Sequence, residues 1–137
     1  MECPADIIFV VDESGSIGAT NFDLMKNFLS RLVSRLGIES GNTRVGLITY
    51  SSDIGSGFNL SDYQTIASVQ SAILSLHYRG GGTDTARALA YVRTTMLTSA
   101  AGDRGNVSNV VVVLTDGHSA NVDHTLVCKV LCALLVT

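Results

Sequence analysis

The sequence has few charged side chains and no excess of basic ones. Asp, Glu, Lys and Arg make up 15% of its 137 residues, and the formal net charge at pH 7 is -3. A nucleic-acid partner requires several Lys or Arg side chains that neutralise phosphates together. We therefore expect no nucleic-acid partner.

A hydrophobic run long enough to span a membrane is also lacking. The longest apolar tract, residues 125–137, is interrupted by Lys129 and falls short of the roughly 20 residues that a spanning helix needs. The N-terminus carries Glu2 where a signal peptide carries basic residues, and no cleavage-site pattern follows. The sequence predicts no membrane insertion and shows no targeting signal.

Cysteine is scarce, and its spacing does not suit a metal site. The three cysteines are Cys3, Cys128 and Cys132. No second Cys or His pair lies at the spacing of a structural zinc site, and an odd count leaves at least one thiol unpaired. A disulfide from Cys3 to either of the others and three free thiols are both compatible with the sequence. Cysteine usage therefore does not decide the redox compartment.

What is present is an alternation of strand and helix patterns, in a chain the length of one domain. Short apolar runs rich in β-branched residues predict buried parallel strands over residues 6–11, 44–51 and 109–114, with a short edge strand at 57–60. Helical patterns lie between these runs. The fold class is therefore predicted as α/β, with a doubly wound, mostly parallel sheet flanked by helices.

Three amphipathic helices are expected between the strands. The first is capped by Thr20 and ended by Gly37, the second is opened by a capping box at residues 61–64, and the third spans residues 85–97. The first helix places seven apolar residues at helical spacing, which predicts that they face the sheet: Phe22, Met25, Phe28, Leu29, Leu32, Val33 and Leu36.

Polar side chains gather where the predicted strands end. Asp12 and Asp116 each follow an apolar run, and Ser14, Ser16 and Thr83 lie in neighbouring loops. In open parallel sheets, ligands bind outside the carboxyl ends of the strands. Two carboxylates and three hydroxyls suit a hard cation such as Mg²⁺ or Mn²⁺. An ion held by neutral hydroxyls would retain positive charge, which a carboxylate from a partner protein could compensate.

The same residues carry a family resemblance. Residues 12–16, Asp-Glu-Ser-Gly-Ser, match the Asp-x-Ser-x-Ser signature of the von Willebrand factor A (VWA) and integrin I-like domain family, whose site is called the metal ion-dependent adhesion site (MIDAS). Residues 81–84 resemble the threonine loop of that family, and residues 114–117 resemble its second aspartate loop. The resemblance implies a Rossmann-like VWA fold and extends from Ala5 to about Asn121.

The resemblance also implies roles for the five candidate metal ligands. Ser14 and Ser16 would bind Mg²⁺ or Mn²⁺ directly, and Thr83 would bind it directly when a partner is engaged. Asp12 and Asp116 would act mostly through water. Glu13 is not a motif position.

The function implied by the resemblance is metal-dependent adhesion without enzymatic turnover. The partner would be a protein that presents Asp or Glu, such as collagen or another extracellular matrix protein, and the location would be extracellular or at the cell surface.

Two alternatives stay open. A scaffold domain of this fold would bind partners away from the metal, and competition by a carboxylate-bearing peptide would distinguish it. A phosphatase with Asp12 as the aspartyl nucleophile would need a general acid nearby, but Ser14 stands two residues on, and the two lysines fall within predicted helices.

The end of the chain departs from the family pattern. The domain is expected to span residues 5–137 and to lack the last strand and helix units. Residues 123–135 carry apolar side chains at i, i+4 spacing, which predicts a helix packed through Val127, Leu131 and Leu135 rather than a fifth parallel strand.

Overall fold

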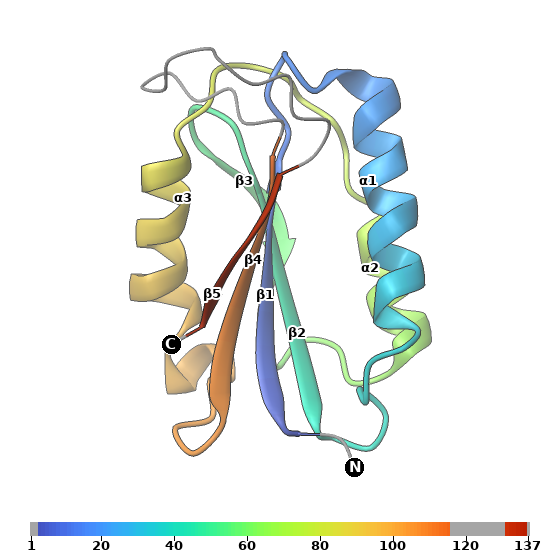
Figure 1. Ribbon diagram of the computed structural model, residues 1–137, viewed down its shortest axis with the longest axis vertical. Coiled ribbons are helices and arrows are strands. Elements are labelled where there is room, and N and C mark those ends of the chain that lie inside the picture. The colour runs from blue at the N-terminus through green and yellow to red at the C-terminus, as the bar shows by residue number, and fades with distance from the viewer. Residues whose placement is uncertain (1–2, 116–130, 137) are drawn as a thin grey trace.

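The computed structural model describes residues 3–115 and the backbone of residues 131–136. These residues form one twisted sheet with the strand order β3-β2-β1-β4-β5 and helices on both faces (Figure 1). The three central strands are parallel: β1 (Ala5–Asp12), β2 (Thr43–Tyr50) and β4 (Ser108–Thr115). The two outer strands pair antiparallel to their neighbours: β3 (Ile54–Phe58) and β5 (Leu131–Val136). The predicted α/β class with a mostly parallel sheet is confirmed.

The helices divide the core into two layers. On one face lie α1 (Gly18–Val33) and α2 (Ile66–Leu74), and on the other lies α3 (Thr85–Tyr91), which continues into the π-helical segment η1 (Val92–Met96) (Figure 1). A 3-10 turn, η2 (Ser99–Ala101), follows. No helix within residues 3–115 combines the length and the hydropathy needed to cross a membrane.

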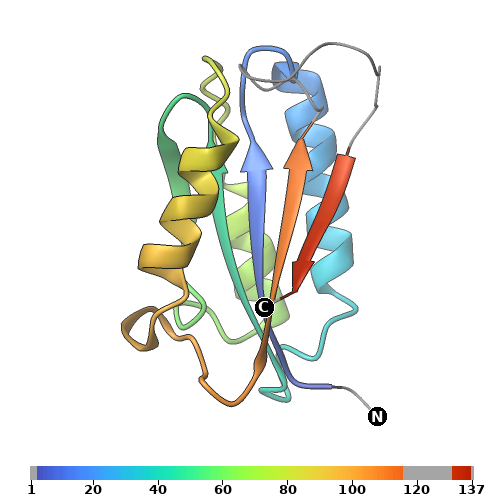
Figure 2. The same cartoon turned by 60° about the vertical axis from the view of Figure 1, so that its left-hand side comes forward.

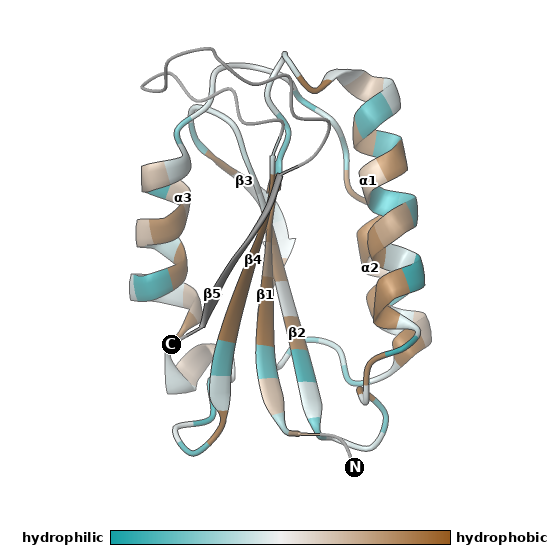
Figure 3. Ribbon diagram, in the orientation of Figure 1, coloured by the Kyte–Doolittle hydropathy of each residue, from teal (hydrophilic) through white to brown (hydrophobic). Residues whose placement is uncertain are grey.

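Strand β1 lies at the centre and contributes to both layers. Phe9 and Val11 belong to the apolar cluster beneath α1 and α2, whereas Ile8 and Val10 belong to the cluster beneath α3. Because alternate side chains of a strand point to opposite faces, an unbroken apolar run suits a strand covered on both sides. Figure 3 shows this apolar stretch along the middle of the strands, with hydrophilic residues near their amino ends.

The first helix differs from its prediction at its start and on its outer face. It begins at Gly18 after Ile17, which provides no side-chain cap, so Thr20 is not the capping residue, and it ends at Val33 rather than near Gly37. The side chain of Phe28 is 54% exposed. Its predicted burial was wrong because the helix turns the Met25 and Leu29 stripe to the sheet and leaves Phe28 outside that stripe.

The second helix starts later than predicted. Its capping box joins Thr65 and Ser68, each side chain accepting from the other residue's backbone N–H. Residues 59–62 instead form a turn, in which the Asn59 N–H donates to Asp62 Oδ2. Because residues 60–62 lie in this turn and α2 begins at Ile66, Thr65 caps the helix, and the predicted box at residues 61–64 was wrong.

The C-terminal prediction was also wrong. Residues 131–136 form β5, which runs antiparallel to β4 with Leu131 opposite Thr115 and Val136 opposite Val110 (Figure 2). Residues 123–130 lie outside the described part of the chain. A short apolar run does not distinguish helix from strand, and pairing here satisfies the backbone N–H and C=O groups along one edge of β4.

A buried ion pair ties together the amino ends of the strands. The side chain of Asp6 is fully buried and accepts from the backbone N–H and the Nε of Arg104, both at 2.8 Å. The same guanidinium donates to the carbonyl oxygens of Gly41, Ala5 and Asn42. Arg104 thereby joins β1, the loop before β2 and the loop before β4.

We predict that Arg104→Met lowers the free energy of unfolding by about 3–5 kcal/mol, because it leaves the buried Asp6 carboxylate without its cation. Urea unfolding followed by circular dichroism measures the change. Arg93→Met, at an exposed position of η1, should change stability by no more than about 0.5 kcal/mol. Equal effects of the two substitutions would show that the Asp6 and Arg104 ion pair does not stabilise the fold.

Candidate metal centre

The predicted polar cluster lies at the carboxyl ends of the central strands, at the top of the molecule in Figure 1. Asp12 ends β1 and Thr115 ends the neighbouring strand β4. The loop after β1 and the segment leading to α3 cross the same edge of the sheet (Figure 1). The parallel direction of β1, β2 and β4 brings these loops together, because the carboxyl ends of parallel strands share one edge.

Asp12 is held in a fixed orientation below the first loop. Its side chain is fully buried. One carboxylate oxygen, Oδ1, accepts from the Ser14 N–H at 2.8 Å, and the other, Oδ2, accepts from the Thr115 hydroxyl at 2.7 Å. A carboxylate oriented in this way can organise neighbouring groups around an ion as well as bind it.

The two serine hydroxyls lie side by side above Asp12. Ser14 Oγ and Ser16 Oγ are 3.1 Å apart; Ser14 is buried and Ser16 is exposed. Adjacent ligands of an octahedral ion with bonds of about 2.1 Å lie about 3.0 Å apart. The spacing therefore fits two neighbouring coordination positions of Mg²⁺.

The loop that carries Thr83 packs on the serine loop. The Gly15 N–H donates to the Gly81 carbonyl at 2.8 Å, and the Tyr78 hydroxyl donates to the Ser14 carbonyl at 2.9 Å. Gly81 has φ +109°, a conformation that favours glycine. Thr83 itself is half-buried and makes no side-chain hydrogen bond within residues 3–115.

The structure thus brings together Asp12, Ser14 and Ser16, and places the Thr83 loop against them. Asp116, the fifth predicted ligand, lies outside the described residues. Within the described residues, no group of three or more His, Cys, Asp or Glu side chains could hold a metal ion.

Sequence reasoning missed two residues at this edge. Thr115 is not among the predicted site residues, yet its hydroxyl donates to Asp12 Oδ2. Glu13 was set aside, yet it is fully buried, and its Oε1 accepts from Arg79 Nε at 2.8 Å and from the second guanidinium nitrogen at 2.6 Å. The only sequence signal for Glu13 was its place between two motif residues, directly after a buried strand.

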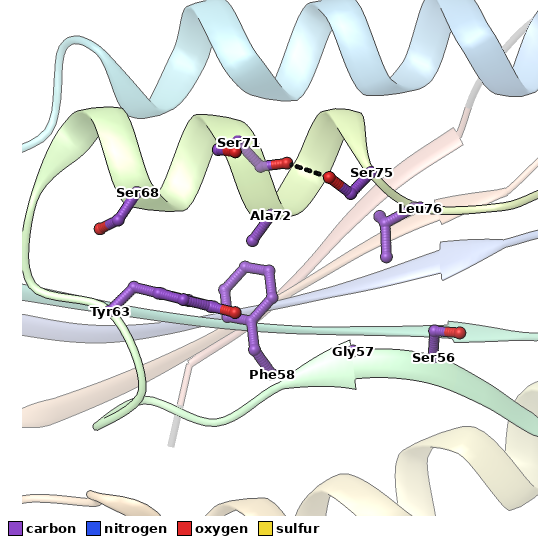
Figure 4. Close-up of a pocket in the computed structure, with 9 residues that line it drawn as sticks. All are labelled: Ser56, Gly57, Phe58, Tyr63, Ser68, Ser71, Ala72, Ser75 and Leu76. Atoms are coloured by element: carbon purple, nitrogen blue, oxygen red, sulfur yellow. Dashed lines mark hydrogen bonds between the residues drawn. The ribbon is translucent and has the colours of Figure 1, made fainter.

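A concavity lies between β3 and α2, away from the residues of the candidate metal centre. It has a volume of about 340 Å³ and is lined by serines together with the Phe58 and Tyr63 rings, which meet edge to face (Figure 4). Ser68 belongs to the capping box of α2, and the Ser75 hydroxyl donates to the Ser71 carbonyl. Two of its hydroxyls thus hydrogen-bond within α2 or its cap, and no charged side chain lines the concavity.

Comparison with known proteins identifies the family. The model of the von Willebrand factor type A domain matches residues 6–133, and the chain belongs to that family. It is 42% identical over 120 residues to the collagen alpha-4(VI) chain of Mus musculus, covering 86% of this chain and 5% of that one. It is 34% identical over 114 residues to matrilin-1 of Homo sapiens, covering 83% of this chain and 23% of that one. The chain thus spans only a small part of these relatives.

A solved structure shares the same fold. Proximal thread matrix protein 1 from the mussel byssus superposes with a TM-score of 0.81 at 27% identity, covering 89% of this chain and 33% of that one. A further structure of the mussel protein has a zinc-occupied MIDAS motif, with a TM-score of 0.78, 26% identity and coverage of 90% and 33%.

These relatives define the class of protein. The chain is a VWA domain of the adhesion type found in collagens and matrilins, and like those domains it is not an enzyme. The resemblance inferred from the motifs is confirmed, and so is the expected absence of enzymatic activity. The phosphatase alternative is excluded on the same grounds.

We predict that Gly55→Ala destabilises the fold by about 1–3 kcal/mol, because a Cβ at this position would overlap Thr49 Oγ1 and Glu13 Oε1. Gly105→Ala is the matched control, since a Cβ there meets nothing within 4 Å. That control should leave stability within about 0.5 kcal/mol of the parent. Thermal and urea unfolding measure both variants, and similar losses in the two would contradict the close packing around Glu13.

Proposed function

We propose that this domain binds Mg²⁺ or Mn²⁺ at Asp12, Ser14, Ser16, Thr83 and Asp116, and adheres to a partner protein by accepting one Asp or Glu carboxylate at that ion. The observation that carries the proposal is the pair of serine hydroxyls 3.1 Å apart above the buried Asp12. The MIDAS motif that holds zinc in the mussel protein supports a divalent ion at this kind of site.

The proposed ligands differ in charge and in role. Ser14 and Ser16 would bind the ion directly as neutral hydroxyls, and Thr83 would join them when a partner is bound. Asp12 already accepts two hydrogen bonds, which suits a carboxylate that acts mostly through water. Asp116 follows β4 directly in sequence and would act in the same way. Because few of the ligands that bind directly are anionic, the ion keeps positive charge, which a partner carboxylate can compensate.

The small number of direct ligands favours Mg²⁺ or Mn²⁺. Ca²⁺ prefers a larger shell of about six to eight oxygens at about 2.3–2.6 Å, often with bidentate carboxylates, whereas Mg²⁺ needs six oxygens and keeps several of its waters. We therefore expect Ca²⁺ to support binding less well.

The relatives support proposals for the partner and for the location of this domain. The relatives include collagen and matrilin chains, which are extracellular matrix proteins. We propose an extracellular or cell-surface location and a matrix partner, with collagen as the first protein to test. Binding through another face, as a scaffold would use, is the alternative outcome.

We predict that Ser14→Ala combined with Ser16→Ala weakens Mn²⁺ binding by about 100-fold or more, since two direct ligands are lost at once. Isothermal titration calorimetry should show one divalent site in the parent. Ser34→Ala combined with Ser71→Ala is the control for loss of hydroxyls, because Ser34 is the exposed residue that directly follows α1 and Ser71 is an exposed residue of α2. Unchanged Mn²⁺ affinity in the Ser14 and Ser16 double variant would remove these residues from the metal site.

We predict that binding to immobilised collagen is lost with a chelator, returns with Mg²⁺ or Mn²⁺ and returns less with Ca²⁺. Asp116→Ala should abolish this binding while far-UV circular dichroism stays nearly unchanged, because the residue organises a surface ion rather than the core. Asp23→Ala, at an exposed acid of α1, is the matched control. Collagen binding that survives both the chelator and Asp116→Ala would support the scaffold alternative, and an Asp-containing peptide should compete only with a metal-mediated contact.

A further inference from the structure

Two loops at the candidate metal centre are joined by a row of contacts. Residues 13–15 follow β1 and carry the first serine, and residues 78–81 precede Thr83. Arg79 pairs with Glu13, the Tyr78 hydroxyl donates to the Ser14 carbonyl, and the Gly15 N–H donates to the Gly81 carbonyl. Each residue of the first loop is therefore held by a residue of the second.

From these contacts we infer that Glu13 and Arg79 are a positioning pair, which holds the Thr83 loop on the serine loop and so sets the geometry of the metal site. The inference rests on the proposed function for its effect on metal binding. Neither residue is among the five proposed ligands. Their role would be to bring ligands from two distant parts of the sequence into one coordination sphere.

Burial makes Glu13 dependent on Arg79. The Glu13 side chain is fully buried, whereas that of Arg79 is 47% exposed. Both contacts of the guanidinium reach Oε1, and Oε2 is buried without a hydrogen-bond partner in the described part of the chain. A buried carboxylate that loses its cation is strongly destabilising. Movement of residues 13–15 toward water would relieve that cost and would separate the two loops.

The segment between Arg79 and Thr83 cannot hold Thr83 in place by itself. It consists of three glycines, and Gly80 and Gly81 both have positive φ. Glycine has the greatest backbone freedom of any residue, so order in this segment has to come from its contacts with the rest of the chain. Within the segment, the Gly81 carbonyl accepts from the Gly15 N–H and the Gly82 N–H donates to Ser52 Oγ at 3.1 Å. At one end Arg79 is fixed to Glu13, and at the other the Asp84 N–H donates to the Ser51 carbonyl at 2.8 Å.

These two ends connect Thr83 to different strands. Ser51 directly follows β2, so the Asp84 contact fixes Thr83 relative to the sheet. Glu13 directly follows β1 and lies between Asp12 and Ser14, so the Arg79 contact fixes Thr83 relative to the serine hydroxyls. Loss of the ion pair would leave the sheet contact intact and weaken the attachment of the loop to the serines, which would then rest on the Tyr78 and Gly81 contacts alone.

The test compares two variants of the pair with a matched control in the intact chain. Arg79→Gln removes the cation, and Glu13→Gln combined with Arg79→Gln removes both charges, so that no buried charge is left to unfold the protein. Arg87→Gln is the control, because Arg87 forms an ion pair with Asp53 at the same end of the molecule, and both side chains are largely exposed. The control makes the same change of residue type outside the pair.

Two readouts separate positioning from general stability. Without metal, hydrogen exchange of the Gly15 amide reports its bond to Gly81, and we expect about tenfold faster exchange in both pair variants. With metal, Mn²⁺ titration followed by electron paramagnetic resonance should show affinity reduced by about 10- to 100-fold. The double variant should unfold at the same midpoint as the parent, but its Gly15 amide should still exchange faster and its Mn²⁺ affinity should still be lower. Arg87→Gln should match the parent in Gly15 exchange and in Mn²⁺ affinity.

The inference is overturned if the double variant exchanges its Gly15 amide and binds Mn²⁺ like the parent. It is also overturned if Arg87→Gln produces equal losses. If the parent protein binds no Mn²⁺, the proposed function is wrong. The metal-free exchange of the Gly15 amide would still decide whether the pair holds the loops together.

Discussion

The two hydrogen bonds accepted by the Asp12 carboxylate connect three parts of the chain on which the site depends. They join the end of β1 to the serine loop through the Ser14 N–H and to the end of β4 through the Thr115 hydroxyl. Because Asp12 is fully buried, these bonds are shielded from water and restrict the loop strongly. The hydroxyls of Ser14 and Ser16 are consequently presented at the edge of a rigid sheet rather than on a free loop.

Two ion pairs with a buried acid lie at opposite ends of the sheet. Asp6 and Arg104 close the amino ends of the strands, where the guanidinium satisfies several backbone carbonyls. Glu13 and Arg79 lie at the carboxyl ends, where the pair joins loops instead of strands. Both acids are fully buried, and each faces an arginine that is more exposed than itself. The same type of interaction thus stabilises the fold at one end and, in our proposal, arranges the ligands at the other.

Family membership and local geometry support different parts of the functional conclusion. The collagen and matrilin relatives define a non-enzymatic adhesion domain. The hydroxyl spacing supports a divalent ion as the proposed means of adhesion. In that proposal, the uncharged serine ligands connect the metal site to adhesion, because they leave the ion able to attract a carboxylate from another protein.

The sequence by itself determined what local pattern and motif spacing can encode. The apolar runs located β1, β2 and β4, and the polar residues after β1 identified Asp12, Ser14 and Ser16 as neighbours. The motifs also identified the family. These features depend on short stretches of chain, whose periodicity and order are readable without knowledge of distant contacts.

Only the tertiary structure decided features that depend on distant partners. Glu13 and Arg79 are separated by 66 positions in sequence, and no local pattern links them. Residues 131–136 became an antiparallel strand because β4 offered an edge for pairing, although their apolar spacing also suited a helix. Phe28 stayed exposed because the packing of α1 against the sheet selected one stripe of a helix that has apolar residues on two sides. In each case the choice between locally acceptable alternatives was made by a contact that forms only when the chain is folded.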